Sequence, residues 1–204
     1  MTALEIVPDR SALLVLDFQN ETVEPGGSRY ANFQGELAKR NTVANAADAI
    51  RWARLHSIEV IFVTVGWRPG YPEQSRSPQM SAAHAAGGFQ EGTWGTQVTE
   101  RLARLPTDIL IHKRGVSAFN GTELQRYLTV RGLSTLLLAG VATNWAVEST
   151  ARDAADLGYG VITLLDCCAS FSGEMHEFSA NRILPLLGAV TTVAELKEAP
   201  STTA

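Results

Sequence analysis

The sequence predicts an α/β protein built on a doubly wound, mainly parallel sheet of six strands with helices on both faces. Five short runs are almost continuously apolar, which is typical of strands buried on both faces of a parallel sheet. Amphipathic helical patterns lie between these runs, and a sixth, weaker apolar run follows the fifth one. Strands that alternate with helices through right-handed crossovers give this architecture. The length of 204 residues suits a single domain over residues 1–204.

Each predicted strand corresponds to one apolar run. In chain order these are ALLVLDF (12–18), EVIFVTV (59–65), DILIHK (108–113), STLLLAGV (134–141), GVITLLD (160–166) and the weaker GAVTTV (188–193). The segment 66–95, between the second and third strands, is rich in Gly, Pro and Ser and is expected to be irregular. A loop of this length in a compact domain is usually functional or mobile.

Three segments have helical periodicity. They are residues 41–55, 122–131 and 144–157. In the second segment, Thr122 and Gln125 have the spacing of a capping box, and Gly132 is expected to end the helix. In the third, Glu148 and Arg152 have the i, i+4 order that favours an ion pair on an exposed face.

The composition argues against several classes of function. The formal net charge is only −4 and no basic or acidic block is present, which argues against nucleic acid or a membrane surface as partner. No apolar run is long enough to span a bilayer, and the opening MTALEIVPDRSALL lacks the features of a secretion signal. We therefore predict a cytoplasmic protein that acts on a small molecule. The adjacent Cys167 and Cys168 are interpreted as buried thiols in a reducing compartment.

Ligands of such sheets bind at the carboxyl ends of the strands, and charged residues end two of the predicted strands. Asp17 closes the first strand, where a carboxylate is costly to bury unless it is paired. Lys113 closes the third and would keep Asp17 ionised and oriented. The structural alternative for Asp17 is a turn residue after the strand, and the structural alternative for Lys113 is a solvated strand end. His112 alternates with Lys113 and is expected to face away from it, and Asp166 is assigned a structural role.

The stretch AGVATNWAVEST, residues 139–150, has the pattern of a strand end, a tight turn and a helix start. Free backbone N–H groups and the positive end of the helix dipole suit such a turn to an oxyanion hole. A cysteine there would have a pKa below its reference of about 8.5, and Asp17 could take its proton. The first turn instead carries Trp145, Ala146 and Val147, none of which is a nucleophile.

Four stretches carry a resemblance to a known family. They are LLVLDFQN (13–20), KRGVSAFNGTEL (113–124), LLLAGVATNWAVESTARDAADLGYGV (136–161) and DCCAS (166–170). In this order they resemble the isochorismatase-like cysteine hydrolase superfamily, which includes nicotinamidases, N-carbamoylsarcosine and ureidoacrylate amidohydrolases, and isochorismatases. The resemblance implies the isochorismatase-like α/β fold for the whole chain.

The resemblance also implies a catalytic triad of Asp, Lys and Cys. Asp17 matches the family's aspartate, the general base, and Lys113 matches its lysine. The family pattern G-V-x-T-x-x-C-V places the nucleophilic cysteine at Ala146. The resemblance further implies a cis peptide bond between Val141 and Ala142, and an oxyanion hole formed by the backbone N–H groups of Ala142 and Ala146.

Three explanations of Ala146 are open. We favour an amidohydrolase whose nucleophile was removed by engineering, because the rest of the motif has the amidohydrolase form. Its triad would cleave a linear amide, carbamoyl or ureido C–N bond through a thioester, and the chain with alanine would be nearly inactive. Alternatively, the protein is a cysteine-independent hydrolase of the isochorismatase type, which protonates a vinyl ether with its aspartate. The third explanation is a ligand-binding pseudoenzyme.

The resemblance also bears on metals, substrate and assembly. Nicotinamidases of the superfamily bind a metal through an Asp-x-His pair and a further His, whereas residues 66–95 hold only His84 and no Asp. No metal and no cofactor are therefore expected. Superfamily members commonly form dimers or tetramers, so a homodimer or homotetramer is expected. The candidate substrate-binding residues near the strand ends are Gln19, Asn20, Trp67, Trp94, Phe119, Asn144 and Trp145; the aromatic ones have core packing or a subunit interface as the alternative.

Overall fold

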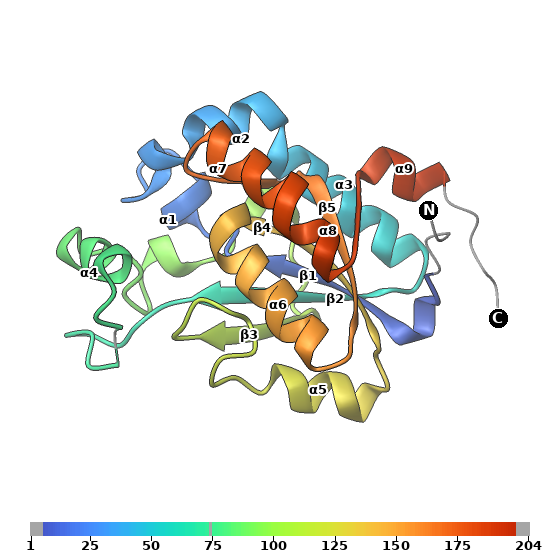
Figure 1. Cartoon of the computed structure of the whole chain (residues 1–204). Helices are drawn as coiled ribbons and strands as arrows, with labels where there is room; N and C mark the ends of the chain where they lie inside the picture. The colour runs from blue at the N-terminus through green and yellow to red at the C-terminus, as the bar shows by residue number, and fades with distance from the viewer. Residues whose placement is uncertain (1–5, 74, 199–204) are drawn as a thin grey trace.

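The computed structural model describes residues 6–73 and 75–198, and one six-stranded sheet forms its centre (Figure 1). The strand order is β3-β2-β1-β4-β5-β6, and every neighbouring pair is parallel. The strands are β1 (Ser11–Leu16), β2 (Glu59–Val65), β3 (Ile109–Lys113), β4 (Thr135–Val141), β5 (Gly160–Ala169) and β6 (Ala189–Thr191). The predicted doubly wound α/β class is confirmed. Residues 1–5, which open the segment inspected for a secretion signal, and residues 74 and 199–204 of the predicted domain lie outside the described residues.

Helices cover both faces of the sheet (Figure 1). The α-helices of the described residues are α1 (Asn20–Val23), α2 (Gln34–Arg40), α3 (Thr42–Leu55), α4 (Pro78–Ala85), α5 (Leu124–Arg131), α6 (Glu148–Asp156), α7 (Gly173–Phe178), α8 (Leu184–Leu187) and α9 (Val193–Glu198). None of the helices within the described part of the chain is long and apolar enough to cross a membrane.

The central strand β1 explains why the apolar runs are continuous. Leu13 and Val15 belong to one buried cluster, which also contains side chains of α2, α3 and α9. Leu14 and Leu16 belong to a second cluster, on the opposite face, with side chains of α5, α6 and α8. Because successive side chains of a strand point to opposite faces, both sets must be apolar when both faces are covered.

The structure corrects three expectations about element boundaries. Segment 66–95 is not wholly irregular, because α4 lies within it, preceded by Ser77, whose side chain accepts a hydrogen bond from the backbone N–H of Met80. The predicted capping box of the helix after β3 does not form: the N-cap of α5 is Glu123, which makes no side-chain capping hydrogen bond, and the Thr122 hydroxyl accepts from the N–H of Leu124 at 3.3 Å. The helix after β4 begins with a π-helical turn, Thr143–Val147, rather than with a regular α-helical turn.

The end of β5 also differs from the expectation. The strand continues to Ala169, so Cys167 and Cys168 lie within it, and both are free, buried thiols. Asp166 has the structural role that was predicted, because both carboxylate oxygens accept from the backbone N–H of Val193 at 3.1 Å and so hold the start of α9. The predicted ion pair between Glu148 and Arg152 is present at 2.9 Å.

Candidate active site

A buried ion pair lies at the carboxyl edge of the sheet. The Lys113 ammonium group, at the end of β3, donates a hydrogen bond of 2.8 Å to Oδ2 of Asp17, which directly follows β1. The two side chains are only 1% and 10% exposed. Lys113 also donates to the carbonyl of Val116. The second carboxylate oxygen, Oδ1 of Asp17, is buried and has no hydrogen-bond partner among the described residues.

The backbone at Asp17 turns sharply as the strand ends. Its φ is 56°, in the left-handed region that Asp tolerates better than most residues, and its N–H donates to the carbonyl of Val63 at 2.9 Å. Burial raises the pKa of the Asp17 carboxyl above its ordinary value, and the charge and hydrogen bond of Lys113 counteract this rise. A carboxylate with a raised pKa is a better general base than an exposed one.

The turn after β4 reaches the same edge of the sheet. The Val141–Ala142 peptide bond is cis, as the sequence resemblance implies. The carbonyl of Ala142 accepts hydrogen bonds from the N–H groups of Trp145 at 3.1 Å and Val147 at 3.2 Å, which closes the π-helical turn. Ala146 lies within this turn and is buried.

A histidine that sequence analysis did not single out supports this turn. The hydroxyl of Thr143 and Nδ1 of His176, on α7, share a hydrogen bond of 2.7 Å. Burial lowers the pKa of His176 to about 4, so the imidazole is neutral at ordinary pH. No pattern in the sequence connects these two residues, which are 33 positions apart.

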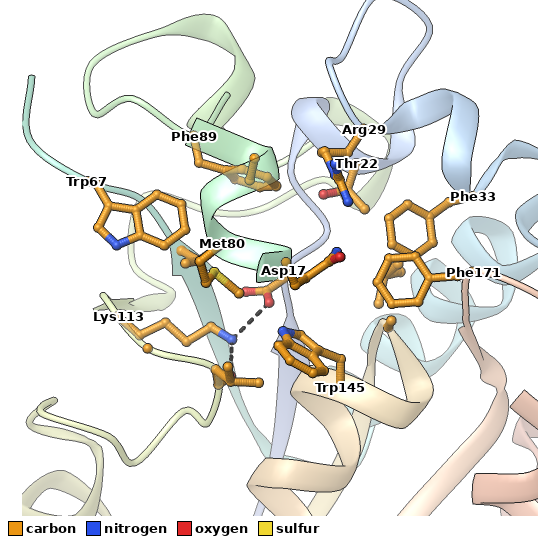
Figure 2. Close-up of a pocket in the computed structure, with 17 residues that line it drawn as sticks. Asp17, Thr22, Arg29, Phe33, Trp67, Met80, Phe89, Lys113, Trp145 and Phe171 are labelled. Atoms are coloured by element: carbon orange, nitrogen blue, oxygen red, sulfur yellow. Dashed lines mark hydrogen bonds and ion pairs between the residues drawn. The ribbon is translucent and has the colours of Figure 1, made fainter. Parts of the chain in front are cut away.

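A pocket connects the ion pair with the turn after β4. About 520 Å³ of space in and just outside the pocket is not filled by protein atoms, and the pocket opens to solvent; its walls are largely apolar and aromatic (Figure 2). The lining residues are Asp17, Thr22, Arg29, Phe33, Val65, Trp67, Gln79, Met80, Ala83, Phe89, Lys113, Gly115, Val116, Val141, Ala142, Trp145 and Phe171. A concave, mostly apolar site with few polar groups is typical of a small-molecule site.

Two of the seven candidate substrate-binding residues line this pocket. Trp67 is buried, and its Nε1 donates to the carbonyl of Arg114 at 3.1 Å, so only its ring faces the pocket. Trp145 differs, because its Nε1 is buried without a hydrogen-bond partner among the described residues. An unsatisfied buried donor in a pocket wall is available to a ligand.

The other candidates are not among the lining residues. The Gln19 amide donates to the carbonyl of Val65 at 2.8 Å and accepts from the N–H of the same residue at 2.9 Å, so it is committed to the protein backbone. The Asn20 amide donates to the carbonyl of Trp94 at 2.9 Å, and the Trp94 side chain is half-exposed. Phe119 packs against a tyrosine, with ring centroids 5.8 Å apart.

Asn144 is likewise engaged elsewhere, because its side-chain oxygen accepts from the hydroxyl of Ser170. Sequence reasoning missed the walls supplied by irregular segments, notably Arg29, Phe33 and Phe171, because none of them belongs to a periodic pattern. His112 faces away from the pocket as predicted: it is partly exposed, and its Nε2 lies 2.9 Å from a carboxylate oxygen of Glu91.

The described residues include no group of three His, Cys, Asp or Glu side chains placed to hold a metal ion. His84, on α4, instead packs against Tyr71, with ring centroids 3.9 Å apart.

Residues 11–195 match the Isochorismatase domain. The chain belongs to the isochorismatase family. It is 35% identical over 197 residues to the uncharacterized isochorismatase family protein YecD of Escherichia coli O157:H7, covering 96% of this chain and 99% of that protein. It is 31% identical to the ureidoacrylate amidohydrolase RutB of Acinetobacter baylyi over 93% of this chain and 83% of the relative.

The fold agrees with this membership. The crystal structure of a cysteine hydrolase from Pseudomonas syringae pv. phaseolicola 1448A superposes with a TM-score of 0.85 at 26% identity, covering 96% of this chain and 94% of the other. The protein is therefore an isochorismatase-family hydrolase with the α/β fold of its relatives.

Proposed function

We propose that this isochorismatase-family hydrolase cleaves a linear C–N bond in a small amide, carbamoyl or ureido compound. Its triad is Asp17, Lys113 and a cysteine at position 146, where this chain has alanine. The observation that carries the proposal is the buried Asp17–Lys113 pair in the wall of a largely apolar pocket, with Oδ1 of Asp17 free of any hydrogen bond among the described residues. The similarity to a protein named as a ureidoacrylate amidohydrolase supports the choice of bond.

In the cysteine form, Asp17 takes the proton of the thiol, and the thiolate attacks the carbonyl carbon of the substrate. Backbone N–H groups at positions 142 and 146 stabilise the oxyanion. Protonated Asp17 then gives its proton to the leaving nitrogen, the C–N bond breaks, and ammonia or an amine departs from a thioester. Asp17 next deprotonates a water molecule that attacks the thioester, which releases the acid and regenerates the thiol. Lys113 keeps Asp17 ionised and oriented between these steps.

The direct test compares the chain as it stands with Ala146→Cys, measuring ammonia release from a panel of small amides and ureides. We expect turnover in the cysteine variant only, and we expect Asp17→Asn in that background to abolish it. Ala146→Ser is the matched control, because it adds a side-chain oxygen of lower nucleophilicity at the same position.

A cysteine variant that is silent on the whole panel would contradict the proposal, and turnover of isochorismate by the alanine form would establish the vinyl ether alternative. A pseudoenzyme would bind the same small molecule in both forms and convert it in neither. The cytoplasmic location and the homodimer or homotetramer stay predictions, and light scattering on the purified protein would measure the subunit number.

A further inference from the structure

Two of the residues that line the pocket carry a buried polar atom with no hydrogen-bond partner among the described residues. One atom is an acceptor, Oδ1 of Asp17, and the other is a donor, Nε1 of Trp145. The lining residue Trp67 differs, because its Nε1 donates to the carbonyl of Arg114 at 3.1 Å. Buried polar atoms are nearly always paired, so the expected partner of the two free atoms is a ligand.

The Asp17 carboxylate has one engaged and one free oxygen. Lys113 donates to Oδ2 at 2.8 Å and also to the carbonyl of Val116. The ammonium group is therefore committed on the Oδ2 side, and Oδ1 is left for a donor from outside the protein. A carboxylate oxygen accepts strong, charge-assisted hydrogen bonds, so an N–H group is a suitable partner.

The indole of Trp145 is carried by a constrained backbone. The residue lies in the π-helical turn Thr143–Val147, and its backbone N–H donates to the carbonyl of Ala142 at 3.1 Å. The hydroxyl of Thr143, two positions earlier, shares a hydrogen bond of 2.7 Å with Nδ1 of His176. The turn thus presents the indole N–H from a defined position, which lowers the entropic cost of binding a ligand.

The two free atoms lie in the same part of the pocket. In Figure 2 the indole of Trp145 lies beside the Asp17 carboxylate, with its nitrogen turned toward Asp17 and Lys113. One group that donates to Asp17 and accepts from Trp145 would satisfy both atoms. An amide or ureide with an N–H has this donor and acceptor in one planar unit, whereas an ester has acceptors only.

We propose that Asp17 and Trp145 together bind the scissile amide or ureide group: its N–H donates to Oδ1 of Asp17, and its carbonyl oxygen accepts from Nε1 of Trp145. The indole N–H then stabilises the oxyanion together with the backbone N–H groups at positions 142 and 146. The leaving nitrogen lies at the carboxyl group that protonates it. Trp145 is thus a catalytic residue, and esters are poor ligands. The catalytic part rests on the proposed function, whereas the recognition of an N–H amide rests on the two free atoms.

Binding to the chain as it stands tests this recognition without any turnover. Protein labelled with nitrogen-15 would be titrated with benzamide and with methyl benzoate, which share a flat carbonyl group and differ in the amide N–H. The indole N–H signal of Trp145 is identified as the one missing from Trp145→Phe. We expect both compounds to shift this signal, and benzamide to bind about 10- to 100-fold more tightly, because a hydrogen bond to a charged group contributes on that scale.

Two variants separate the two hydrogen bonds, with affinities measured from backbone amide shifts. Trp145→Phe keeps an aromatic ring and should weaken both compounds about 2- to 10-fold, since each loses the same neutral hydrogen bond. Asp17→Asn should remove the preference for benzamide, because Lys113 retains the side-chain oxygen and the NH₂ group then faces the ligand. Trp52→Phe is the matched control on α3, where the ring stacks on His56 with centroids 4.5 Å apart, and should leave both affinities unchanged.

A Trp145 indole signal that neither compound shifts would overturn the recognition, and so would equal affinities of the two compounds for the parent chain. A preference for benzamide that survives in Asp17→Asn, shown to be folded by circular dichroism, would also overturn it.

The outcomes for the two proposals are separable. In the Ala146→Cys background, we expect Trp145→Phe to lower kcat about 100-fold on an amide that the cysteine variant hydrolyses. If kcat is unchanged and the indole signal does not shift, the recognition fails and the amidohydrolase stands. If the cysteine variant is silent while benzamide binding depends on both Asp17 and Trp145, the recognition stands and the amidohydrolase fails.

Discussion

Replacing Lys113 with methionine would leave the Asp17 carboxylate buried without its cation. The pair is almost fully enclosed, with an N–O distance of 2.8 Å. Removing one partner of a buried ion pair costs about 3–5 kcal/mol, because the remaining charge is uncompensated. We therefore expect the free energy of unfolding of Lys113→Met at pH 7 to fall by about 3–5 kcal/mol. Asp17→Asn in the same chain removes the stranded charge, so the double variant should cost less than the sum of the single ones, by about 1–3 kcal/mol.

The pH dependence of this loss has a definite sign. Without Lys113, burial alone acts on Asp17, so its folded pKa lies further above the unfolded value of about 3.9. Between those two values the folded state holds a proton that the unfolded chain has released, so stability falls as pH rises. The deficit of Lys113→Met relative to the parent should thus be smallest near pH 4 and grow towards neutrality.

Urea unfolding at several pH values from 4 to 7 would measure both effects in the parent, the two single variants and the double variant. Asparagine is the suitable replacement for Asp17, because it also tolerates the left-handed φ of 56° at this position. A deficit below about 1 kcal/mol that does not change with pH would refute the reasoning, since that is the behaviour of an exposed pair.

Three further predictions concern the same edge of the sheet. Gly140→Ala should lower the free energy of unfolding by about 1–3 kcal/mol in urea, because the added Cβ would lie 2.7 Å from Cβ of Leu16; an unchanged midpoint would contradict that close approach. Trp145→Phe removes a buried donor that has no partner among the described residues, so the melting temperature should stay the same or rise. Calorimetry should show weaker binding of the small amide or ureide that the pocket takes, and an unchanged affinity would show that the indole N–H does not contact it. His176 has a folded pKa of about 4 against an ordinary 6.5, so the unfolded chain takes up the proton first and stability falls as pH drops through that range. The loss should be about 3 kcal/mol in the parent and smaller in His176→Gln; equal pH profiles in urea titrations would refute it.

The sequence predicts the sheet and the ion pair for the same physical reason. Parallel strands covered on both faces must be apolar at every position, and their carboxyl ends meet at one edge, so polar residues placed there are conspicuous. On this basis Asp17 and Lys113, separated by 96 positions, were candidates for a pair, with a turn residue and a solvated strand end as the alternatives, and the family resemblance favoured the pair. The length of each strand could be predicted less well from the sequence. Strand β5 extends past Asp166 through a register shift relative to β4, and no local sequence pattern encodes this shift.

The walls of the pocket could not be predicted in the same way. Gln19 has the chemistry of a substrate ligand, and only the tertiary path of residues 65–96 shows that backbone groups occupy its amide. Arg29 lines the pocket, and an arginine in an irregular loop has no sequence feature that predicts this position. For both residues, the surroundings of the side chain are set by groups distant in the sequence, and these are brought together only in the folded chain.

The two native thiols make this protein convenient for chemical labelling. Cys167 and Cys168 lie inside β5, and burial raises the pKa of Cys168 to about 12 and that of Cys167 well above its ordinary value. Both thiols are therefore protonated and shielded from alkylating reagents at neutral pH. A fluorophore or spin label could be attached at one introduced surface cysteine of the folded protein, with the native pair left in place.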